Sequence, residues 1–276
     1  MATINFLYPE NSEIKYHIDI FPDGHTHLVI DSELNRRESI KIITRLTTMD
    51  DLFILLQAKD IFDRHLIFVS HLKISYLISS RMDRVMDFNQ ACDLKIILEI
   101  LKRNFVGTTI EIFELHNIKS DINLTKSDFI ESLFMDELKS IYNLSDTSKV
   151  YIFPDKGASE RYAWIKLKNT TICASKERID GKIKISLPEF DINDDQELIV
   201  MDDLCDGGGT FFAIYAALPK KYQDRVHLIV SHVIQYDAIV NLAKLYKSVT
   251  ITNSFKNWDK YKFPENVTVL QLYTNE

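Results

Sequence analysis

Residues 197–218 of the chain are "ELIVMDDLCDGGGTFFAIYAAL". A short apolar run leads into Asp202 and Asp203, and then into three consecutive glycines of only seven in the whole chain. The run predicts a buried strand that ends near Met201, and the segment from about Phe211 predicts a helix. A strand, a loop without side chains and a helix in this order are typical of the ligand-binding edge of a parallel sheet.

The loop from Asp206 to Thr210 predicts an anion site. Because glycines leave the backbone bare, N–H groups in such a loop can point at an anion, and the helix behind it adds a favourable dipole. Walker A and GxGxxG loops lack paired acids before the glycines, so the loop is neither of these. Acids beside a phosphate cradle indicate a ligand with phosphate at one end and hydroxyls or a metal ion near the other, such as a sugar phosphate. The alternative is a glycine-rich turn whose acids face water.

Composition limits the class of protein. With 276 residues the chain has room for one large domain or two ordinary ones, and 46% hydrophobic with 26% charged residues is typical of a globular protein. The net charge of −7 argues against a general nucleic-acid binder. Scattered cysteines without a CxxC pair suggest a reducing compartment and no structural zinc. The sequence shows no signal peptide and no apolar run of about 20 residues, so we expect a cytoplasmic protein that binds neither nucleic acid nor membrane.

Strand-like apolar runs alternate with helix-like segments along the chain. Strands are predicted at 65–72, 109–115, 149–153, 197–201, 226–230 and 248–252, and helices around 94–101, over 127–142 and over 235–246. This alternation indicates an α/β protein with parallel sheets and helices on both faces. The pattern occurs twice, and the polar stretch "NLSDTSK" (143–149) separates the halves. We therefore predict two domains, 1–146 and 147–276.

Five motifs together resemble one family. "LIVMDDLCDGGGT" resembles the phosphoribosyl-pyrophosphate motif shared by type I phosphoribosyltransferases and ribose-phosphate diphosphokinases (PRPP synthetases). Four further segments resemble synthetase motifs in the family's order and with comparable spacing: "RMDR" (81–84), "ELHN" (114–117), "PDKGASERY" (154–162) and "SKER" (175–178). Each motif is ordinary alone, but the ordered set is specific and covers nearly the whole chain. "RMDR" with "PDKGASERY" looks especially like the synthetase-like branch associated with NAD salvage, including phage-encoded proteins.

The resemblance implies two tandem type I phosphoribosyltransferase-like domains and a set of site residues. The implied ribose 5-phosphate site is Asp202, Asp203, Asp206, Gly207, Gly208, Gly209 and Thr210. The implied ATP-binding residues are Arg81, Asp83, Phe21, Asp23 and His25. The implied catalytic residues are Lys176, Arg178 and His116, and the implied metal ligands are His116 and Asp155. Arg161 matches a basic residue of the family.

The implied reaction moves a diphosphoryl group from ATP to the C1 hydroxyl of ribose 5-phosphate, which gives PRPP and AMP for nucleotide biosynthesis. Mg²⁺ is the implied cofactor, because hard oxygen ligands suit it. In the family the hairpin matching "FPDGH" (21–25) completes the ATP site of a neighbouring subunit. The implied assembly is therefore a homo-oligomer, either a dimer or a larger ring such as a hexamer.

Two departures from the family and three alternatives remain. Gly207 stands where the family has Thr, which removes a hydroxyl donor to the 5-phosphate, and His25 stands where the family has Glu, at the adenine-binding edge. A type I phosphoribosyltransferase shares the loop but does not explain "RMDR" and "ELHN". A non-catalytic regulatory homologue shares the fold, but here Lys176, Arg178, His116 and Asp155 are all present. The third alternative is an unrelated two-domain α/β protein.

Overall fold

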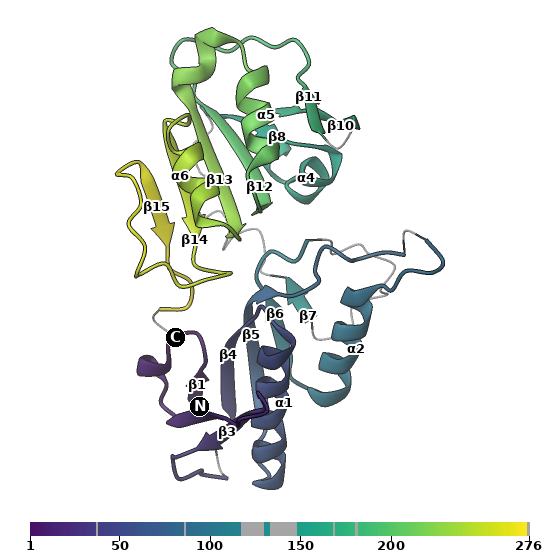
Figure 1. Cartoon of the computed structure of the whole chain (residues 1–276), viewed down its shortest axis with the longest axis vertical. Helices are drawn as coiled ribbons and strands as arrows, with labels where there is room; N and C mark the ends of the chain where they lie inside the picture. The colour runs from purple at the N-terminus through teal and green to yellow at the C-terminus, as the bar shows by residue number, and fades with distance from the viewer. Residues whose placement is uncertain are drawn as a thin grey trace. The chain divides into compact units, whose positions relative to one another are not determined.

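The computed structural model of the chain describes residues 1–36, 38–85, 87–116, 130–132, 148–167, 169–179 and 182–274. The chain divides into two compact units: unit 1 is Met1–Leu133 together with Tyr273–Glu276, and unit 2 is Phe134–Leu272. Each unit holds a parallel sheet with helices packed beside it (Figure 1), as the predicted α/β class requires. The predicted boundary at 146/147 lies outside the described residues and stays a prediction.

Over the described residues, unit 1 is built on a five-stranded sheet in the order β1-β4-β5-β6-β7. All its strand pairs are parallel, and the strands are β1 (Ala2–Asn5), β4 (Ile40–Leu46), β5 (Val69–Leu77), β6 (Thr109–Ile112) and β7 (Ile130–Ser132). The central strand β4 is apolar on both faces, since its consecutive residues Ile42 and Ile43 are completely buried. Such strands are expected in a parallel sheet that helices cover on both sides.

Helices α1 (Met49–Arg64) and α2 (Asp93–Asn104) supply the rest of the unit 1 core. α1 begins at Thr48, whose hydroxyl accepts from the Asp51 N–H at 3.2 Å while the Asp51 carboxylate accepts from the Thr48 N–H at 2.8 Å. This reciprocal pair is a capping box, which satisfies backbone donors at the first turn. α2 buries the residues whose spacing predicted a helix: Leu94, Ile97, Leu98 and Leu101.

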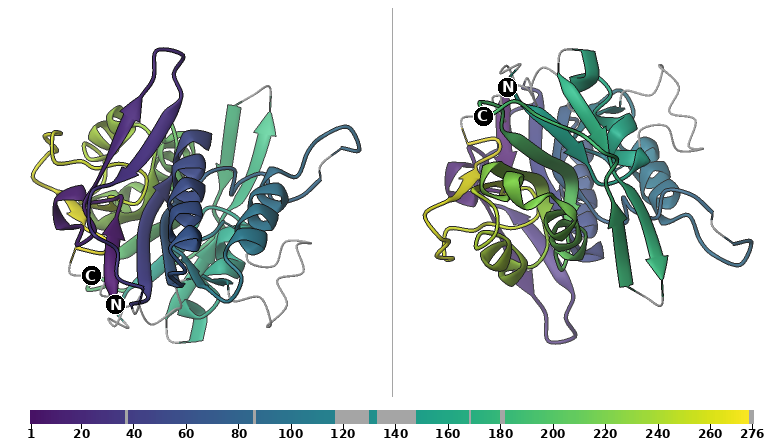
Figure 2. Two further views of the ribbon diagram at one scale, coloured as in Figure 1. Left: turned by 90° about the horizontal axis from the view of Figure 1, so that it is seen from below. Right: turned by 90° about the horizontal axis from the view of Figure 1, so that it is seen from above.

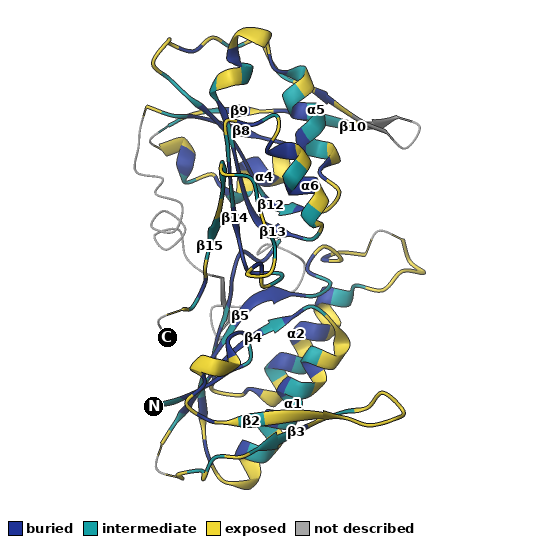
Figure 3. Cartoon of the chain, turned by 60° about the vertical axis from the view of Figure 1, so that its left-hand side comes forward, coloured by how far each residue is buried: buried dark blue, intermediate teal, exposed yellow. Residues whose placement is uncertain are grey.

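A hairpin of β2 (Tyr16–Ile20) and β3 (Thr26–Ile30) lies outside the unit 1 sheet, as does the short helix η1 (Pro9–Asn11). The hairpin rests on α1 through Gln57, whose side chain accepts from the Leu28 N–H at 2.7 Å and donates to the Thr26 carbonyl at 2.9 Å. Its outer part is exposed (Figure 3), and the left view of Figure 2 shows it projecting from the sheet.

In the part of unit 2 that the structure describes, a six-stranded parallel sheet has the order β15-β14-β13-β12-β8-β9. Its strands are β8 (Val150–Phe153), β9 (Thr170–Cys173), β12 (Leu198–Cys205), β13 (Val226–Val233), β14 (Ser248–Thr252) and β15 (Val267–Leu270). The helices are α4 (Lys156–Arg161), η2 (Ile165–Leu167), α5 (Gly209–Ala217), η3 (Lys220–Arg225) and α6 (Tyr236–Leu242). A separate antiparallel hairpin joins β10 (Ser175–Ile179) to β11 (Lys182–Ser186).

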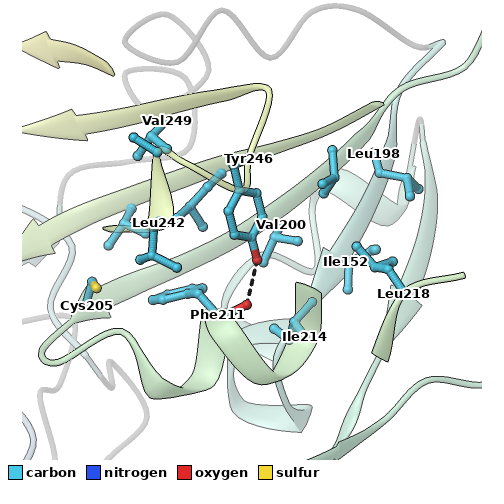
Figure 4. Close-up of a cluster of buried hydrophobic side chains, with 14 of the residues drawn as sticks. Ile152, Leu198, Val200, Cys205, Phe211, Ile214, Leu218, Leu242, Tyr246 and Val249 are labelled. Carbon is cyan, nitrogen blue, oxygen red and sulfur yellow. Dashed lines mark hydrogen bonds between the residues drawn. The ribbon is translucent and has the colours of Figure 1, made fainter. Parts of the chain in front are cut away.

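The core of unit 2 fixes the start of α5. Figure 4 shows Tyr246 lying among Leu242, Val200 and Phe211 in a cluster of buried side chains. The Tyr246 hydroxyl donates to the Phe211 carbonyl at 2.8 Å, and both residues are almost fully buried. Because Phe211 belongs to the first turn of α5, this contact ties the glycine loop before it to the core.

The structure corrects several sequence predictions. β12 does not end near Met201 but runs to Cys205, because β13 pairs with it through Asp202 and beyond. The motif "SKER" (175–178), whose polar residues by themselves indicate a loop, lies on β10 of the β10–β11 hairpin. The helix predicted over 127–142 is wrong at Ile130–Ser132, which form β7 against β6; the rest of that segment lies outside the described residues. The first predicted strand, 65–72, is instead β5 over Val69–Leu77, because the chain turns through Leu66 (φ +58°) after α1 ends at Arg64.

None of the helices that the structure describes has the length and apolar character to cross a membrane.

Candidate functional site

The carboxyl ends of β8 and β12 bring three aspartates to one edge of the unit 2 sheet. The two strands pair in parallel, and their last registered pair is Ile152 with Val200. Continued three residues further, the same register brings Asp155 level with Asp203. Asp202 and Asp203 lie within β12, so sheet pairing fixes their backbone. Carboxyl ends of parallel strands are the usual position of ligand sites in open α/β sheets.

Arg161 at the end of α4 joins the two β12 carboxylates. Its Nη1 lies 2.5 Å from Asp203 Oδ1 and 3.4 Å from Asp202 Oδ1, and the three side chains are at most 15% exposed. Burial, together with the charge of Asp203, raises the pKa of Asp202 well above its ordinary value, although Arg161 opposes the shift. A carboxyl group with a raised pKa beside a buried ion pair is a poorly solvated polar group, which favours a hydrogen-bonding ligand.

Asp155 both caps a helix and faces the hairpin lysine. Its Oδ1 accepts from the Ala158 N–H at 3.0 Å at the start of α4, while its Oδ2 lies 3.9 Å from Lys176 Nζ. Lys176 is 22% exposed and comes from β10, so the hairpin brings a cation to the edge that carries the aspartates. Arg178 follows on β10, opposite Ile183, and the structure describes only its backbone.

The glycine loop follows directly from β12 and opens α5. Gly208 is the N-cap of α5 and has φ +80°, a conformation that L side chains rarely adopt. A Cβ atom at Gly208 would lie 3.0 Å from the Phe212 ring and 3.3 Å from Leu242 Cδ1, so a side chain there would force these neighbours to shift. At Gly207 the nearest atom to a Cβ would be Gln235 Nε2 at 3.9 Å, which is ordinary contact. The two central glycines therefore differ: Gly208 is required by the backbone, and Gly207 leaves open space.

The ATP-side residues predicted in unit 1 follow two paired strands. The chain leaves β5 through Ser79 (φ +63°) and leaves β6 through Glu114 (φ +44°), both in the left-handed region. Such strain in non-glycine residues is uncommon and clusters at binding sites. Arg81 comes two residues after Ser79 and is exposed, whereas Asp83 is buried. His116 comes two residues after Glu114 and is half-buried.

The predicted "FPDGH" residues form the tip of the β2–β3 hairpin. The Phe21 N–H donates to the His25 carbonyl at 2.9 Å, and the Asp23 carboxylate accepts from the His25 N–H at 3.0 Å, so Asp23 stabilises its own turn. The rings of Phe21 and His25 stack with centroids 5.8 Å apart, and the Phe53 ring of α1 meets His25 edge-on at 5.7 Å. Phe21 remains 46% exposed, so the tip presents an accessible aromatic surface.

Sequence reasoning did not predict that Gln235 contacts the glycine loop. Its Nε2 donates to Asp206 Oδ1 at 3.0 Å, which joins the residue after β13 to the glycine loop. The spacing of 29 residues between them gives no local signal. The pairing of β12 with β13 does indicate this contact, because a residue just beyond β13 must lie beside the residues just beyond β12.

Comparison with known proteins agrees with the overall resemblance to PRPP synthetases. No family model matches the chain. The chain is 26% identical over 227 residues to a ribose-phosphate pyrophosphokinase of Mycoplasmopsis pulmonis. The match covers 75% of this chain and 69% of that protein. The crystal structure of phosphoribosylpyrophosphate synthetase from Mycobacterium smegmatis superposes with a TM-score of 0.73 at 16% identity, over 98% of this chain and 95% of that one. The structural likeness confirms the predicted α/β fold with mostly parallel sheets. The sequence likeness extends over most of both chains, so the chain is similar in sequence to a ribose-phosphate pyrophosphokinase and in fold to a PRPP synthetase.

Proposed function

We propose that the chain is a ribose-phosphate diphosphokinase, which transfers the diphosphoryl group of ATP to the C1 oxygen of ribose 5-phosphate and releases AMP. One observation carries the proposal. The largely buried Asp202 and Asp203, joined to Arg161, come directly before the bare loop Asp206–Thr210. Carboxylates that bind hydroxyls, followed by a loop that binds phosphate, suit the two ends of ribose 5-phosphate.

The glycine loop supplies the phosphate end of this proposed site. A phosphate lying at the start of α5 would meet backbone N–H groups and the positive end of the helix dipole. The absence of a side chain at Gly208 lets the backbone come close to the ligand, and the Thr210 hydroxyl adds a donor. The core contact between Tyr246 and Phe211 supports this role, because a rigid loop loses less entropy when it binds a ligand.

The aspartates supply the sugar end. Ribose hydroxyls are donors and acceptors, and a carboxyl group can match both roles when its pKa is raised, as that of Asp202 is. Arg161 offsets the charge of Asp203 and holds its carboxylate in one orientation. A sugar held at both ends would present its C1 oxygen in a fixed direction, which is the main requirement of phosphoryl transfer.

In the reaction, the C1 oxygen forms a bond to the β-phosphorus of ATP while the bond from that phosphorus to the α,β-bridging oxygen breaks. The C1 hydroxyl gives up its proton to solvent, and AMP leaves with the bridging oxygen. Lys176 would supply positive charge to the phosphoryl oxygens as negative charge shifts among them. Its position 3.9 Å from Asp155 supports this role, since Nζ already lies at the edge that carries the sugar site. We assign Arg178 the same kind of role from its sequence match.

The donor set fits Mg²⁺. Within the described ranges no three His, Cys, Asp or Glu side chains are grouped closely enough to hold a metal ion by themselves. Mg²⁺ keeps several waters and is usually held by one or two carboxylates and substrate phosphates, so Asp155 with its neighbouring aspartates is a suitable set. When bound with ATP, the ion would neutralise phosphate charge and orient the diphosphoryl group. From its sequence match, His116 is proposed to help hold Mg²⁺-bound ATP.

ATP is proposed to bind at the unit 1 edge through Arg81 and Asp83, helped by the hairpin residues of a second subunit. The hairpin supports an assembly of at least two subunits, because it exposes apolar side chains that a monomer leaves in water: Ile18 is 38% exposed, Ile20 75% and Phe21 46%. A cytoplasmic location fits these substrates. Assignment to the NAD-salvage branch stays a prediction.

The direct test is AMP formation from ATP and Mg²⁺, with and without ribose 5-phosphate, with the product followed by ³¹P NMR. We expect AMP and a new diphosphate ester at the ribose C1, and neither product with unphosphorylated ribose. Nucleotide formation from PRPP and a free base, with no AMP from ATP, would indicate a phosphoribosyltransferase instead. Binding of ATP and ribose 5-phosphate without turnover would indicate a regulatory homologue.

A further inference from the structure

Sheet pairing brings the residue after β13 to the glycine loop. β12 and β13 stay paired to their last residues, Cys205 with Val233, and the Ile234 N–H donates to the Cys205 carbonyl at 2.9 Å. Asp206 follows Cys205 and starts the glycine loop. Gln235 follows Ile234 and lies beside Asp206. The position of Gln235 is therefore fixed by backbone hydrogen bonds rather than by its own exposed side chain.

The Gln235 amide lies where a donor to a bound phosphate is needed. Its Nε2 donates one hydrogen to Asp206 Oδ1 at 3.0 Å. A primary amide carries two N–H groups, so a second donor remains on the same nitrogen. This nitrogen is also the nearest atom, at 3.9 Å, to the place where a Cβ of Gly207 would stand. The backbone at Gly207 thus lies next to the side-chain amide of Gln235, which follows the neighbouring strand β13.

The Gln235 amide can reduce electrostatic repulsion between Asp206 and a bound phosphate. The Asp206 carboxylate sits in the same loop that would bind a dianionic phosphate, and two anions so close repel each other. A neutral amide that donates one N–H to Asp206 and the other to the phosphate reduces that repulsion without adding charge. It also takes the place of the hydroxyl that Gly207 lacks.

We propose that Gln235 is a binding residue for the 5-phosphate of the sugar substrate, acting as the side-chain donor at the Gly207 position of the loop. The inference rests on the proposed function and deepens it. Gln235 contributes to sugar phosphate affinity and not to the transfer step, because it lies at the phosphate end of the site.

The test compares variants of the full-length protein that change only this donor. Gln235→Met keeps the length and removes the N–H groups; we expect the KM for ribose 5-phosphate to rise about tenfold, with kcat and the KM for ATP within about twofold. Gln235→Glu adds a carboxylate beside Asp206 and should raise the same KM about a hundredfold. Gln223→Met is the matched control, since the Gln223 amide donates to the carbonyls of Tyr215 and Leu218 near the opposite end of β13; the KM for ribose 5-phosphate should not change.

A compensating variant separates donation from simple structure. Gly207 has no positive φ, and the nearest atom to a Cβ there would be Gln235 Nε2 at 3.9 Å, so a side chain fits. In Gln235→Met/Gly207→Thr, a threonine hydroxyl can occupy the space beside the loop, and we expect most of the lost affinity to return. A purely structural role for Gln235 predicts no such recovery, and failure of the double variant to improve on Gln235→Met would count against the inference.

Binding measurements keep the inference testable if turnover is absent. Calorimetry with inorganic phosphate and with ribose 5-phosphate compares wild-type protein with Gln235→Met. Weaker binding of both ligands by the variant supports the inference whether or not AMP is formed. Unchanged affinity for both ligands, with thermal melting that shows both proteins folded, would refute it. Wild-type protein that binds both ligands but forms no AMP would contradict the proposed reaction and leave the binding role of Gln235 standing.

Discussion

Arg161 Nη1 lies 2.5 Å from Asp203 Oδ1, and this ion pair is nearly closed to solvent. Removing one member of a buried pair leaves an uncompensated charge, which costs about 3–5 kcal/mol. We therefore expect Arg161→Met to lower the stability of the protein by about 3 kcal/mol, and Arg161→Met/Asp203→Asn to recover a large part of it. Thermal melting of the three proteins checks this.

The matched control for that pair is Lys156 with Glu160 on the same helix, an i,i+4 pair with side chains 88% and 56% exposed. Exposed pairs contribute little, so Lys156→Met should change stability by less than about 0.5 kcal/mol. Equal losses from Arg161→Met and Lys156→Met would mean that the buried pair has no special energetic role.

The two central glycines of the loop should respond differently to substitution. Gly208→Ala forces a side chain into a left-handed conformation against Phe212, so we expect a loss of about 1–3 kcal/mol and strongly reduced ribose 5-phosphate binding. Gly207→Ala meets no such contact and should melt like the wild-type protein. Thermal melting and calorimetry with ribose 5-phosphate measure both effects. Comparable destabilisation by the two changes would contradict the loop geometry.

Lys176→Ala should reduce turnover rather than sugar binding. Lys176 lies at the aspartate edge but outside the glycine loop, so its positive charge should act mainly on the transition state. We expect kcat to fall about 10²- to 10³-fold, with the KM for ribose 5-phosphate within about threefold. Lys184→Ala on β11 of the same hairpin is the control and should leave kcat nearly unchanged. A raised KM with normal kcat for Lys176→Ala would assign the lysine to ground-state binding.

A cluster at the amino-terminal end of the unit 2 sheet predicts a pH dependence of stability. His227 is half-buried, 3.1 Å from Glu197, and burial lowers the pKa of its imidazole despite the attraction of that carboxylate. A folded-state pKa below the unfolded value of about 6.5 means that the unfolded chain binds more protons. The stability from neutral His227 is therefore full above pH 6.5 and lost as the pH falls through the lowered pKa.

The variant His227→Gln should show a smaller loss of melting temperature than the wild-type protein between about pH 7.5 and pH 5. His17→Gln is the contrasting variant and should not show this smaller loss. The hydrogen bond between His17 and Asp31 raises the pKa of the exposed imidazole, so protonation of His17 does not destabilise the folded protein. If the melting temperatures of His227→Gln and the wild-type protein fall equally over this pH range, His227 does not titrate as described.

Helices and strands with a local signal could be predicted from the sequence. "SVTIT" is bounded by polar residues and forms β14 over Ser248–Thr252, as predicted, and the apolar spacing of α2 marks its buried face. The extension of β12 through two aspartates had no such signal. Those carboxylates disfavour a strand by themselves, and their counter-ion Arg161 lies 41 residues before Asp202.

The same limit applies to the site. The glycine loop could be recognised because its composition is unusual over a few consecutive residues. The β10–β11 hairpin could not, because its polar sequence resembles a loop until Ile185 is seen to be nearly buried on one strand. The contact of Gln235 with Asp206 depends on which strands are neighbours in the sheet, and that order is a property of the whole unit.

The last prediction concerns assembly. The β2–β3 hairpin ends in a stacked Phe21–His25 pair and exposes Ile20, which suits contact with a second copy of the chain. If Phe21 serves the ATP site of a neighbour, Phe21→Ala and Lys176→Ala damage different halves of a shared site. Mixing the two inactive proteins should then restore up to about a quarter of wild-type activity, because random dimers combine both intact halves in some sites. Sedimentation velocity over the same concentrations should show the dimer or larger species, and specific activity should fall on dilution below its dissociation constant. A fully active monomer with no recovery on mixing would show that each site is complete within one chain.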